Sequence, residues 1–278
     1  MFTIRSKVSK LLVMVPLVIV CFFIIFTQVS LDGERSVVFV DVGSGDASLI
    51  EFDDVNFLID GGPNSEIDVY LGKRFPFQCN FAAIFVTHPH KDHFGGLERV
   101  LNRCKVAKVY QNRAGAEGLA YSRWLDTLEG ISESPIYAGR VFEINGSPAS
   151  LYVLWPPKEL LQTGVSNLND VSTVLLFDYG DFEVLFMGDA EANIQDNIKI
   201  EDYLFLIDDG LDILKVAHHG SRDALSKEFM LLLQPKHAVV SVGENSYGHP
   251  NLEHLSFLEG LGTAVWLTSV HGTLRFAF

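Results

Sequence analysis

Three of the nine histidines fall within six consecutive positions, in a run that reads THPHKDHFGG, and Asp92 lies between the second and the third. Imidazole nitrogen and carboxylate oxygen are ligands suited to Zn²⁺, Mn²⁺ and Fe²⁺. A tight loop can direct His88 and His90 at one ion, while Asp92 and His93 face a second. Two ions about 3.5 to 4 Å apart can bind both the attacking and the leaving oxygen of a hydrolytic displacement. The spacing therefore predicts a binuclear metal centre.

A strand and a helix are predicted on either side of this cluster. Residues 83–86 are apolar throughout, which predicts a buried strand that leads to His88. Residues 97–104 resume with apolar residues at helical spacing, and Gly95 and Gly96 allow that helix to pack close to the cluster. The histidines are therefore expected on a strand-to-helix loop.

Further carboxylates and a further histidine come at the ends of other predicted strands. Asp189 and His218 each follow a short apolar run, and Asp41 and Asp60 follow strands in the sequences DVG and DGG. A carboxylate in the position of Asp41 or Asp60 can accept the free N–H of a ligating histidine and so fix its tautomer. The alternative is that both are turn formers, because Asp is common before Gly in turns.

Residues 31–278 are predicted to form one α/β domain, because short β-branched runs alternate with helix-length segments and no Pro- or Ser-rich linker interrupts them. Strands followed by helices occur in both halves, which fits two sheets with helices outside (α+β). The predicted strands are 37–42, 47–52, 55–59, 83–86, 151–154, 174–177, 184–187, 213–217, 238–242, 264–267 and 274–278. The predicted helices are 97–104, 124–129, 227–233 and 252–261.

Residues 1–30 are predicted to be a membrane or export segment. Within them, residues 11–26 form an uncharged apolar run that three cations precede and polar residues follow. Extended to Val29, the run has nineteen residues, enough to span a bilayer, and the cleavage pattern before Leu31 is poor. We therefore expect an uncleaved single-pass anchor in the cell membrane with residues 31–278 outside the cytoplasm. The alternative is a cleaved signal peptide and a secreted or periplasmic protein.

The predicted domain is strongly acidic. The chain has 21 Lys and Arg against 35 Asp and Glu, and three of the cations lie in residues 1–30, which leaves a net charge of −17 for residues 31–278. Such a body repels phosphate backbones at long range, which disfavours the tight non-specific duplex binding of basic proteins. A polyanionic substrate would need metal ions or a local basic patch.

Two cysteines, Cys79 and Cys104, lie in the domain, and Cys21 lies in the apolar run. An oxidising compartment would permit one disulfide between the two domain cysteines, and two separate buried thiols are the alternative. No His or Asn pattern surrounds either residue, so neither is expected to be a nucleophile.

The run from His88 to His93 resembles the HxHxDH signature of the metallo-β-lactamase superfamily. Within that superfamily, the sequence is similar to the soluble carboxy-terminal domains of ComEC-type DNA-uptake competence proteins over nearly all of residues 36–278. The matching stretches keep their order and spacing, and they are FVDVGSGDASLI, FLIDGGPN, VTHPHKDHFGGL, NDVSTVLLFDYGDFEVLFMGDAE, LKVAHHGSRDALSKEFM and AVVSVGENSYGHPN.

The resemblance implies a four-layer αββα sandwich and two divalent metal ions. The ligands that it implies are His88, His90, Asp92, His93, Asp189 and His218. Asp189 would bridge the two ions, and His218 would complete the second site. His219 is the rival for that role, because adjacent side chains cannot easily share one ion. The histidine left over would orient or protonate the substrate.

Two parts of the sequence bear on the remaining ligands and on the substrate. Many members of the superfamily have a further ligating histidine in the middle of the chain, but none occurs here between His93 and His218. ComEC-like domains have an Asn-x-x-Ser pattern in this region, seen here from Asn169 to Ser172, and Asn169 or Asp170 could supply oxygen directly or through water. His249, in the sequence YGHP, resembles a family motif near the mouth of the site and would bind substrate or donate a proton.

The motifs and the resemblance predict a hydrolase that uses metal-activated water, with Asp92, His219 and His249 as catalytic candidates. Zn²⁺ is the expected metal, and Mn²⁺ is the alternative. The substrate class that the resemblance implies is phosphodiesters, as DNA outside the cytoplasmic membrane in a competence role, and the acidic surface favours single strands over duplex. The rival functions are hydrolysis of another ester, a lactone or an amide on the same scaffold, and a non-catalytic module that binds a partner in DNA uptake.

Overall fold

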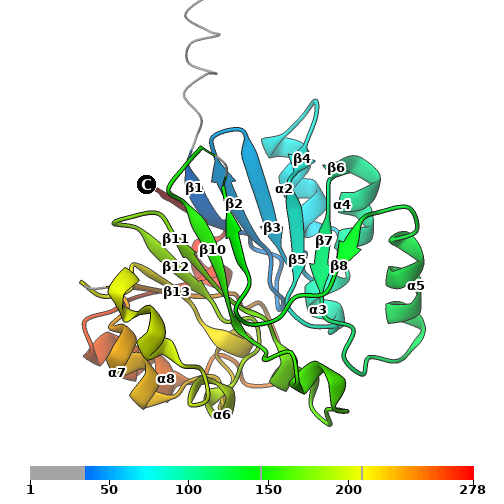
Figure 1. Cartoon of the computed structure of the whole chain (residues 1–278). Helices are drawn as coiled ribbons and strands as arrows, with labels where there is room; N and C mark the ends of the chain where they lie inside the picture. Colours follow the sequence, from blue (N-terminus) through cyan, green and yellow to red (C-terminus); the bar gives the residue numbers. More distant parts are fainter. Residues whose placement is uncertain (1–34, 145, 208) are drawn as a thin grey trace, which may run out of the picture.

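The structure, a computed structural model, describes residues 35–144, 146–207 and 209–278 (Figure 1). The predicted membrane segment, residues 1–30, lies outside the described residues. Across the described ranges, no helix has the length and the apolar character that crossing a bilayer requires.

Two seven-stranded sheets form the middle of the molecule, in the orders β16-β1-β2-β3-β5-β7-β8 and β15-β14-β13-β12-β11-β10-β9. The strands of the first sheet are β1 (Ser36–Phe39), β2 (Ser48–Phe52), β3 (Val55–Ile59), β5 (Ala83–Val86), β7 (Val109–Gln111), β8 (Glu133–Ser134) and β16 (Leu274–Ala277). The strands of the second sheet are β9 (Val141–Glu143), β10 (Ser150–Trp155), β11 (Val174–Asp178), β12 (Glu183–Phe186), β13 (Ile213–Lys215), β14 (His237–Val240) and β15 (Ala264–Leu267). A separate ribbon pairs β4 (Asn80–Phe81) with β6 (Lys105–Val106).

Each sheet is antiparallel on one side and parallel on the other. In the first sheet, β1, β2 and β3 form an antiparallel meander, and β3, β5, β7 and β8 run parallel. In the second sheet, β9 to β12 are antiparallel, and β12 to β15 run parallel. The parallel strands β5, β12 and β13 lead at their carboxyl ends to His88, Asp189 and His218. The candidate ligands therefore follow strands of both sheets.

Aromatic side chains fill the space between the sheets. Phe39 and Phe52 of the first sheet pack against Phe186 and Phe177 of the second, with ring centroids 5.9 and 6.4 Å apart. All four side chains are buried. Burial of one such side chain contributes about 1.5 to 3 kcal/mol to folding. This layer therefore holds the two sheets, and the loops at their ends, in one fixed relation.

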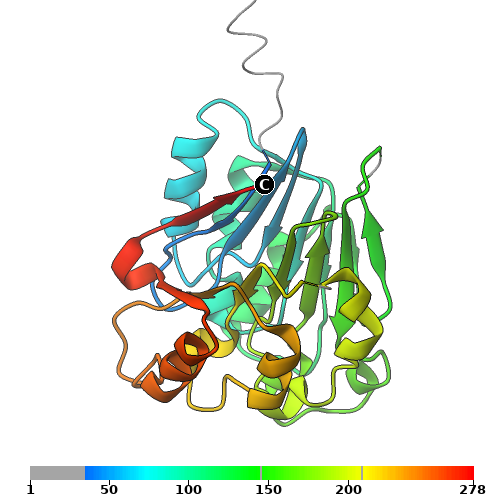
Figure 2. The same cartoon turned by 90° about the vertical axis from the view of Figure 1, so that its left-hand side faces the viewer.

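Helices cover the outer face of each sheet, so the molecule has the predicted αββα layers (Figure 2). Val100 and Trp124 belong to the apolar cluster on the first sheet, and Phe229 and Leu258 belong to the one on the second. The α-helices are α2 (Glu66–Arg74), α3 (Lys91–Phe94), α4 (Leu97–Arg103), α5 (Leu119–Thr127), α6 (Ala192–Gln195), α7 (Lys227–Leu233), α8 (Leu252–Gly260) and α9 (Thr268–His271). Short 3₁₀ helices are η1 (Leu160–Gln162), η2 (Leu168–Val171), η3 (Ile200–Leu206) and η4 (Ala217–Gly220).

Some elements have the bounds that the sequence predicts, and others are not predicted for physical reasons. The strands β3, β5 and β15 and the helix α7 have the predicted bounds. The sequence does not predict α2, because only Ile67 and Leu71 of this helix are buried and its apolar spacing is therefore weak. It also does not predict β7, β8 and β9, which have three residues or fewer and are too short to produce a periodic pattern.

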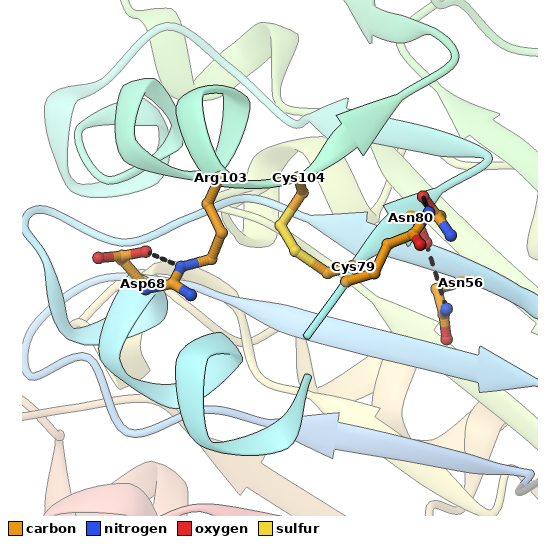
Figure 3. Close-up of a disulfide and its surroundings, with 7 residues drawn as sticks. Asn56, Asp68, Cys79, Asn80, Arg103 and Cys104 are labelled. Atoms are coloured by element: carbon orange, nitrogen blue, oxygen red, sulfur yellow. Dashed lines mark hydrogen bonds and ion pairs between the residues drawn. A yellow bond between two sulfur atoms is a disulfide. The ribbon is translucent and has the colours of Figure 1, made fainter. Parts of the chain in front are cut away.

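A disulfide joins Cys79, just before β4, to Cys104, just after α4 (Figure 3). Their Cα atoms are 4.8 Å apart, and both residues are buried. An ion pair between Asp68 of α2 and Arg103 of α4 lies beside the bridge. Of the two alternatives for these cysteines, the structure contains the disulfide.

Candidate metal centre

The loop after β5 gathers the first three histidines. His88 Nε2 lies 2.9 Å from His90 Nδ1, and the rings of His88 and His93 have centroids 4.2 Å apart. His88 and His93 are fully buried, and His90 is the N-cap of α3 at the edge of the centre. A Cβ atom at Gly96 would lie 2.2 Å from Gly61 O, so the close approach of this loop to the turn after β3 requires glycine.

Asp60 fixes the orientation of His93. Its Oδ2 accepts a hydrogen bond from His93 Nδ1 at 2.8 Å, and Thr87 donates to the same carboxylate from its backbone N at 2.8 Å and its Oγ1 at 2.7 Å. With Nδ1 engaged, His93 Nε2 faces Asp189 Oδ1 at 3.3 Å. A carboxylate behind a histidine selects the tautomer that leaves the other nitrogen free to bind a metal.

Asp189 lies between His88 and His93. One carboxylate oxygen, Oδ2, is 3.5 Å from His88 Nε2, and the other, Oδ1, is 3.3 Å from His93 Nε2. The Asp189 backbone N–H donates to Ser172 Oγ at 2.7 Å, and the same hydroxyl lies 3.2 Å from His88 Nδ1. Ser172 thus holds both the backbone of Asp189 and the far nitrogen of His88.

His218 and His219 follow β13 in a left-handed turn, with φ of 44° and 53°. Non-glycine residues in this conformation cost about 1 to 3 kcal/mol each and persist where the surroundings fix them. His219 points to the early loop, because its Nε2 lies 3.3 Å from Asp92 Oδ2 while its Nδ1 donates to Ser241 O at 2.9 Å. The turn therefore brings a histidine of the second sheet against the first.

His218 has a different set of contacts. Its Nδ1 lies 2.7 Å from Glu191 Oε1 and 3.3 Å from Asn169 Nδ2, while its Nε2 is 3.9 Å from Asp189 Oδ2. Its side chain is 28% exposed, whereas that of His219 is 5% exposed. The predicted oxygen donor Asn169 is buried, and its Oδ1 has no hydrogen-bond partner within the described ranges. Both residues of the Asn169–Ser172 pattern therefore contact the centre.

A buried ion pair stands behind His219. Lys215 Nζ donates to Asp46 Oδ2 at 2.7 Å and to Val216 O at 2.9 Å, and Lys215 is only 1% exposed. The other oxygen, Asp46 Oδ1, lies 3.3 Å from His219 Nδ1. Asp46 comes from the loop before β2, and Lys215 belongs to β13, so the pair also connects the two sheets.

Asp46 was not among the predicted residues, and Asp41 does not have the role predicted for it. Asp41 is exposed, and its Oδ1 accepts from Gly43 N at 3.3 Å, which is the turn-forming alternative. The strand β1 ends at Phe39, earlier than predicted, so Asp41 already belongs to the connecting turn. Asp46 is the second aspartate of the sequence DVGSGD. It follows a glycine rather than an apolar run, so its position gave only a weak signal for a role at the centre.

Carboxylates set the charge of the two best-held histidines. Burial alone would lower the pKa of both, but Asp189 and Asp60 outweigh it for His93, whose pKa is raised well above its usual value. For His219, Asp46 and Asp92 outweigh burial and raise the pKa to about 9. The raised pKa values favour protonated imidazole rings that face carboxylates. A metal cation bound between these groups would displace the protons.

Three groups of side chains have the composition and spacing of a metal site, with candidate ligand atoms within 4.8 Å of one another. Two of them are His88, His93 and Asp189, and Asp92, His93 and His219. The third is Asp46, Asp60 and His93, whose carboxylates already accept hydrogen bonds from Lys215 and Thr87. His93 Nε2 and Asp189 Oδ1 are buried, and neither has a hydrogen-bond partner in the described part of the chain. Unpartnered buried polar atoms are costly, and these are nitrogen and oxygen donors of the kind that divalent ions prefer. The residues present therefore fit a metal centre.

A cavity of about 430 Å³ opens beside these groups. It is lined by Ser44, Pro63, Lys91, Asp92, His218, His219, Tyr247 and His249. The His249 ring lies 5.6 Å from the His218 ring, so this histidine is at the mouth of the site. The histidines for which the sequence suggested no role at the centre include His237, whose Nδ1 accepts from Trp266 Nε1 at 3.2 Å.

The family model of the metallo-beta-lactamase superfamily matches residues 40–244. "ComE operon protein 3" of Bacillus subtilis (strain 168) is 25% identical over 99% of this chain and 37% of its own length. "Recombination protein 2" of Haemophilus influenzae (strain ATCC 51907 / DSM 11121 / KW20 / Rd) is 25% identical over 99% of this chain and 33% of its own length. The chain therefore spans about a third of the length of these curated relatives.

Among solved structures, Tm1679, described as a metal-dependent hydrolase of the beta-lactamase superfamily, superposes with a TM-score of 0.56. The match covers 88% of this chain and 100% of that chain at 15% sequence identity, which shows a common fold. The family match and the two curated relatives agree with the resemblance seen in the sequence motifs.

Proposed function

The chain belongs to the metallo-beta-lactamase superfamily, and from this membership we propose that it is a metal-dependent hydrolase of phosphodiesters. The observation that carries the proposal is the convergence of His88, His93, Asp189, Asp92 and His219 from both sheets, beside a cavity that Asp92 and His219 line. Divalent ions held there supply electrophilic activation of water and of the substrate phosphoryl group. This chemistry needs no serine or cysteine nucleophile.

The first ion would be held by His88, His90 and Asp189. His88 Nε2 and His90 Nδ1 are 2.9 Å apart, and Asp189 Oδ2 lies 3.5 Å from His88 Nε2. No histidine lies between His93 and His218 in the sequence, so a further ligand would have to be another group, for which the buried Asn169 Oδ1 is the candidate. Zn²⁺ suits this set of nitrogen and oxygen donors, and Mn²⁺ is the second candidate.

The second ion would be held by Asp92, His93 and His219, with the other oxygen of Asp189. We assign this role to His219 rather than to His218, the residue that the sequence favoured. His219 Nε2 lies 3.3 Å from Asp92 Oδ2, and the Ser241 carbonyl accepts from its other nitrogen. A ligand held at its second nitrogen in this way is correctly oriented before the metal arrives.

His218 then serves as the proton donor to the leaving oxygen. Glu191 holds its Nδ1 at 2.7 Å, its ring lines the cavity, and Asp189 and Glu191 help to raise its pKa although burial opposes them. His249 lies next to it and is suited to contact the substrate. The same exchange removes His219 from the list of general acids, because a ligating nitrogen cannot also donate a proton.

The substrate class is DNA or another phosphodiester outside the cytoplasm, in a competence role. The support is the similarity to "ComE operon protein 3", together with the Cys79–Cys104 disulfide, which is typical of oxidising compartments. The apolar run of residues 11–26 would anchor the domain to the cell membrane. The net charge of −17 for residues 31–278 favours single strands over duplex.

The test compares the full chain with His90→Ala and Asp189→Ala on bis-p-nitrophenyl phosphate, single-stranded DNA, duplex DNA and a cephalosporin, each with Zn²⁺ and Mn²⁺. We expect turnover of the phosphodiesters and a loss of at least about a hundredfold in both variants, because each loses a ligand. His271→Ala, at an exposed histidine away from the cavity, is the matched control and should keep full activity.

Three outcomes would contradict the proposal. Equal turnover in all variants would point to a contaminant. A preference for the cephalosporin would favour the amide hydrolase among the rival functions. Absence of both turnover and bound metal, the latter measured by mass spectrometry, would favour a non-catalytic binding module, whereas two ions per chain support catalysis.

A further inference from the structure

The cavity beside the centre has an exposed aromatic wall. Tyr247 lines the cavity, and 78% of its surface is exposed. Its ring is stacked on that of His249, with centroids 5.8 Å apart and an angle of 21° between the planes. Of the large, exposed apolar side chains in the described ranges, Tyr247 is the one that lines this cavity. An aromatic face left open beside reactive groups is suited to a flat ligand.

The loop that carries this ring is held rigidly by one side chain. Asn245 Nδ2 donates to Gly243 O and to His249 O, both at 2.9 Å. Asn245 Oδ1 accepts from the backbone N–H groups of Tyr247 and His249, both at 3.1 Å. All four hydrogen-bonding capacities of the Asn245 amide are thereby used. The loop is ordered before any ligand binds, so stacking on Tyr247 loses little conformational entropy.

The cavity also carries one lysine in an otherwise acidic body. Lys91 is the only Lys or Arg among the described residues that line it, next to the candidate ligand Asp92. The net charge of −17 over residues 31–278 makes such a local positive group necessary for a polyanion to approach. A flat aromatic face, a cation and a metal centre on one cavity match the base, the flanking phosphate and the scissile phosphate of a nucleotide chain.

We propose that Tyr247, backed by His249, is the stacking platform for a nucleobase next to the scissile phosphodiester, and that Lys91 pairs with a neighbouring phosphate. The proposal rests on the proposed phosphodiesterase function and adds to it a base-binding subsite. A base inside a duplex is already stacked on both sides, so only an unpaired base can use this platform. The site therefore selects single-stranded nucleic acid through its shape as well as through its charge.

The test uses the full chain and two single-stranded oligonucleotides of equal length, one with bases and one in which every residue is abasic. We expect the wild-type chain to prefer the base-bearing strand by about five- to a hundredfold in kcat/KM, mainly through KM, which is the range for one stacked base. In Tyr247→Ala this preference should fall to near one, and Tyr247→Phe should retain it. Phe205→Ala, at an aromatic residue that is 73% exposed and does not line the cavity, is the matched control and should retain it as well.

Binding measurements separate this proposal from the proposed function. Quenching of a 2-aminopurine strand, titrated without turnover in the presence of a chelator, gives the dissociation constants of the same variants. If the wild-type chain hydrolyses neither strand, the phosphodiesterase function fails, and a loss of quenching in Tyr247→Ala alone would still support the platform. Equal preference, or equal quenching, in the wild-type chain and Tyr247→Ala would overturn the platform even if the hydrolysis is real.

Discussion

Two buried carboxylates lie behind the two histidines at the heart of the centre, and their surroundings are opposite. Asp60 holds His93 and receives two hydrogen bonds from Thr87, which is neutral. Asp46 faces His219 and receives a hydrogen bond from the charged Nζ of Lys215. Burial acts to raise the pKa of both carboxyls. For Asp60 this effect is the largest, and the pKa is raised. Lys215 and His219 outweigh burial for Asp46, whose pKa is lowered far below its usual range.

The difference follows from where each pair lies. Asp60 and Thr87 come from the neighbouring ends of β3 and β5, and His93 comes from α3 shortly after β5; backbone hydrogen bonds such as Asp60 N to Phe85 O fix the geometry there. Asp46 and Lys215 come from different sheets. Their side chains are joined by a strong, charge-assisted hydrogen bond between Lys215 Nζ and Asp46 Oδ2. The comparison indicates that one half of the site is organised by the fold and the other half by charge.

Removal of Lys215 is the strongest way to break this comparison. Lys215→Met leaves Asp46 buried without its cation, and loss of one partner of a buried pair costs about 3 to 5 kcal/mol. We expect that loss in the free energy of unfolding, measured by urea titration. Lys236→Met is the control, because Lys236 is 40% exposed in its ion pairs with Asp209 and Asp212, and it should cost less than about 1 kcal/mol. A double variant with Asp46→Asn should recover part of the loss, and purely additive losses would refute the coupling.

Glu183 at the start of β12 sharpens the comparison, because it is a buried carboxylate that forms no ion pair with a Lys or Arg of the described ranges. Burial, followed by Asp212, Asp178 and Asp209, raises its pKa from 4.5 to about 8, and Lys236 is engaged with Asp209 and Asp212 rather than with Glu183. Between these values the folded chain keeps a proton that the unfolded chain has lost. The free energy of unfolding should therefore fall by about 1.4 kcal/mol for each pH unit of the rise.

The variant Glu183→Gln should remove this decline, so its stability relative to the wild-type chain should increase from pH 5 to pH 7. Urea titrations at pH 5, 6 and 7 measure it. Parallel curves for the two proteins would show that Glu183 is ionised in the folded chain. Such a result would also mean that burial alone does not keep a carboxyl protonated in this sandwich, and the contrast with Asp46 would lose its reference.

The smallest expected effects concern metal affinity. Asp60→Asn and Asp46→Asn each weaken the orientation of one histidine, and loss of such a contact reduces metal affinity by about 10- to 100-fold. Asp60→Asn should lower the free energy of unfolding of the metal-free chain less than Asp46→Asn, because an amide oxygen can still accept from Thr87 N although His93 loses its carboxylate partner. Asp46→Asn should lower it more, since Lys215 loses its partner. Calorimetric titration of Zn²⁺ into the metal-free chain, paired with urea titration, tests this, and the same stability loss in both variants would remove the distinction.

The half of the centre that is organised by the fold is also the half that can be predicted from the sequence. The position of His88 and His90 directly after a strand, with Asp92 and His93 close behind, follows from an apolar run and a dense cluster of ligand types, whereas the sequence did not predict the short helix α3 that holds Asp92 and His93. Asp60 could be predicted because it directly follows a strand whose bounds the apolar pattern gives correctly. Short-range signals suffice where short-range contacts build the site.

The charge-organised half could not be predicted in the same way. Asp46 follows a glycine in a turn, and its partner Lys215 is 169 positions away along the chain. The choice between His218 and His219 depends on two left-handed backbone conformations that non-glycine residues rarely adopt, so no sequence pattern signals them. The short strands β7, β8 and β9 likewise could not be predicted from the sequence, because their hydrogen-bond partners rather than their own residues define them.

The candidate ligands are divided between the two sheets, so metal ions bound by them would cross-link the sheets. An ion that binds His93 on one side and Asp189 on the other would join two layers that also adhere through their apolar faces and through the Lys215–Asp46 ion pair. Chelation would destabilise the contact between the sheets at this edge first. Rising metal concentration would raise the free energy of unfolding by RT ln(1 + [M]/Kd). Resistance of the folded chain to proteases would then report how much metal the surroundings provide.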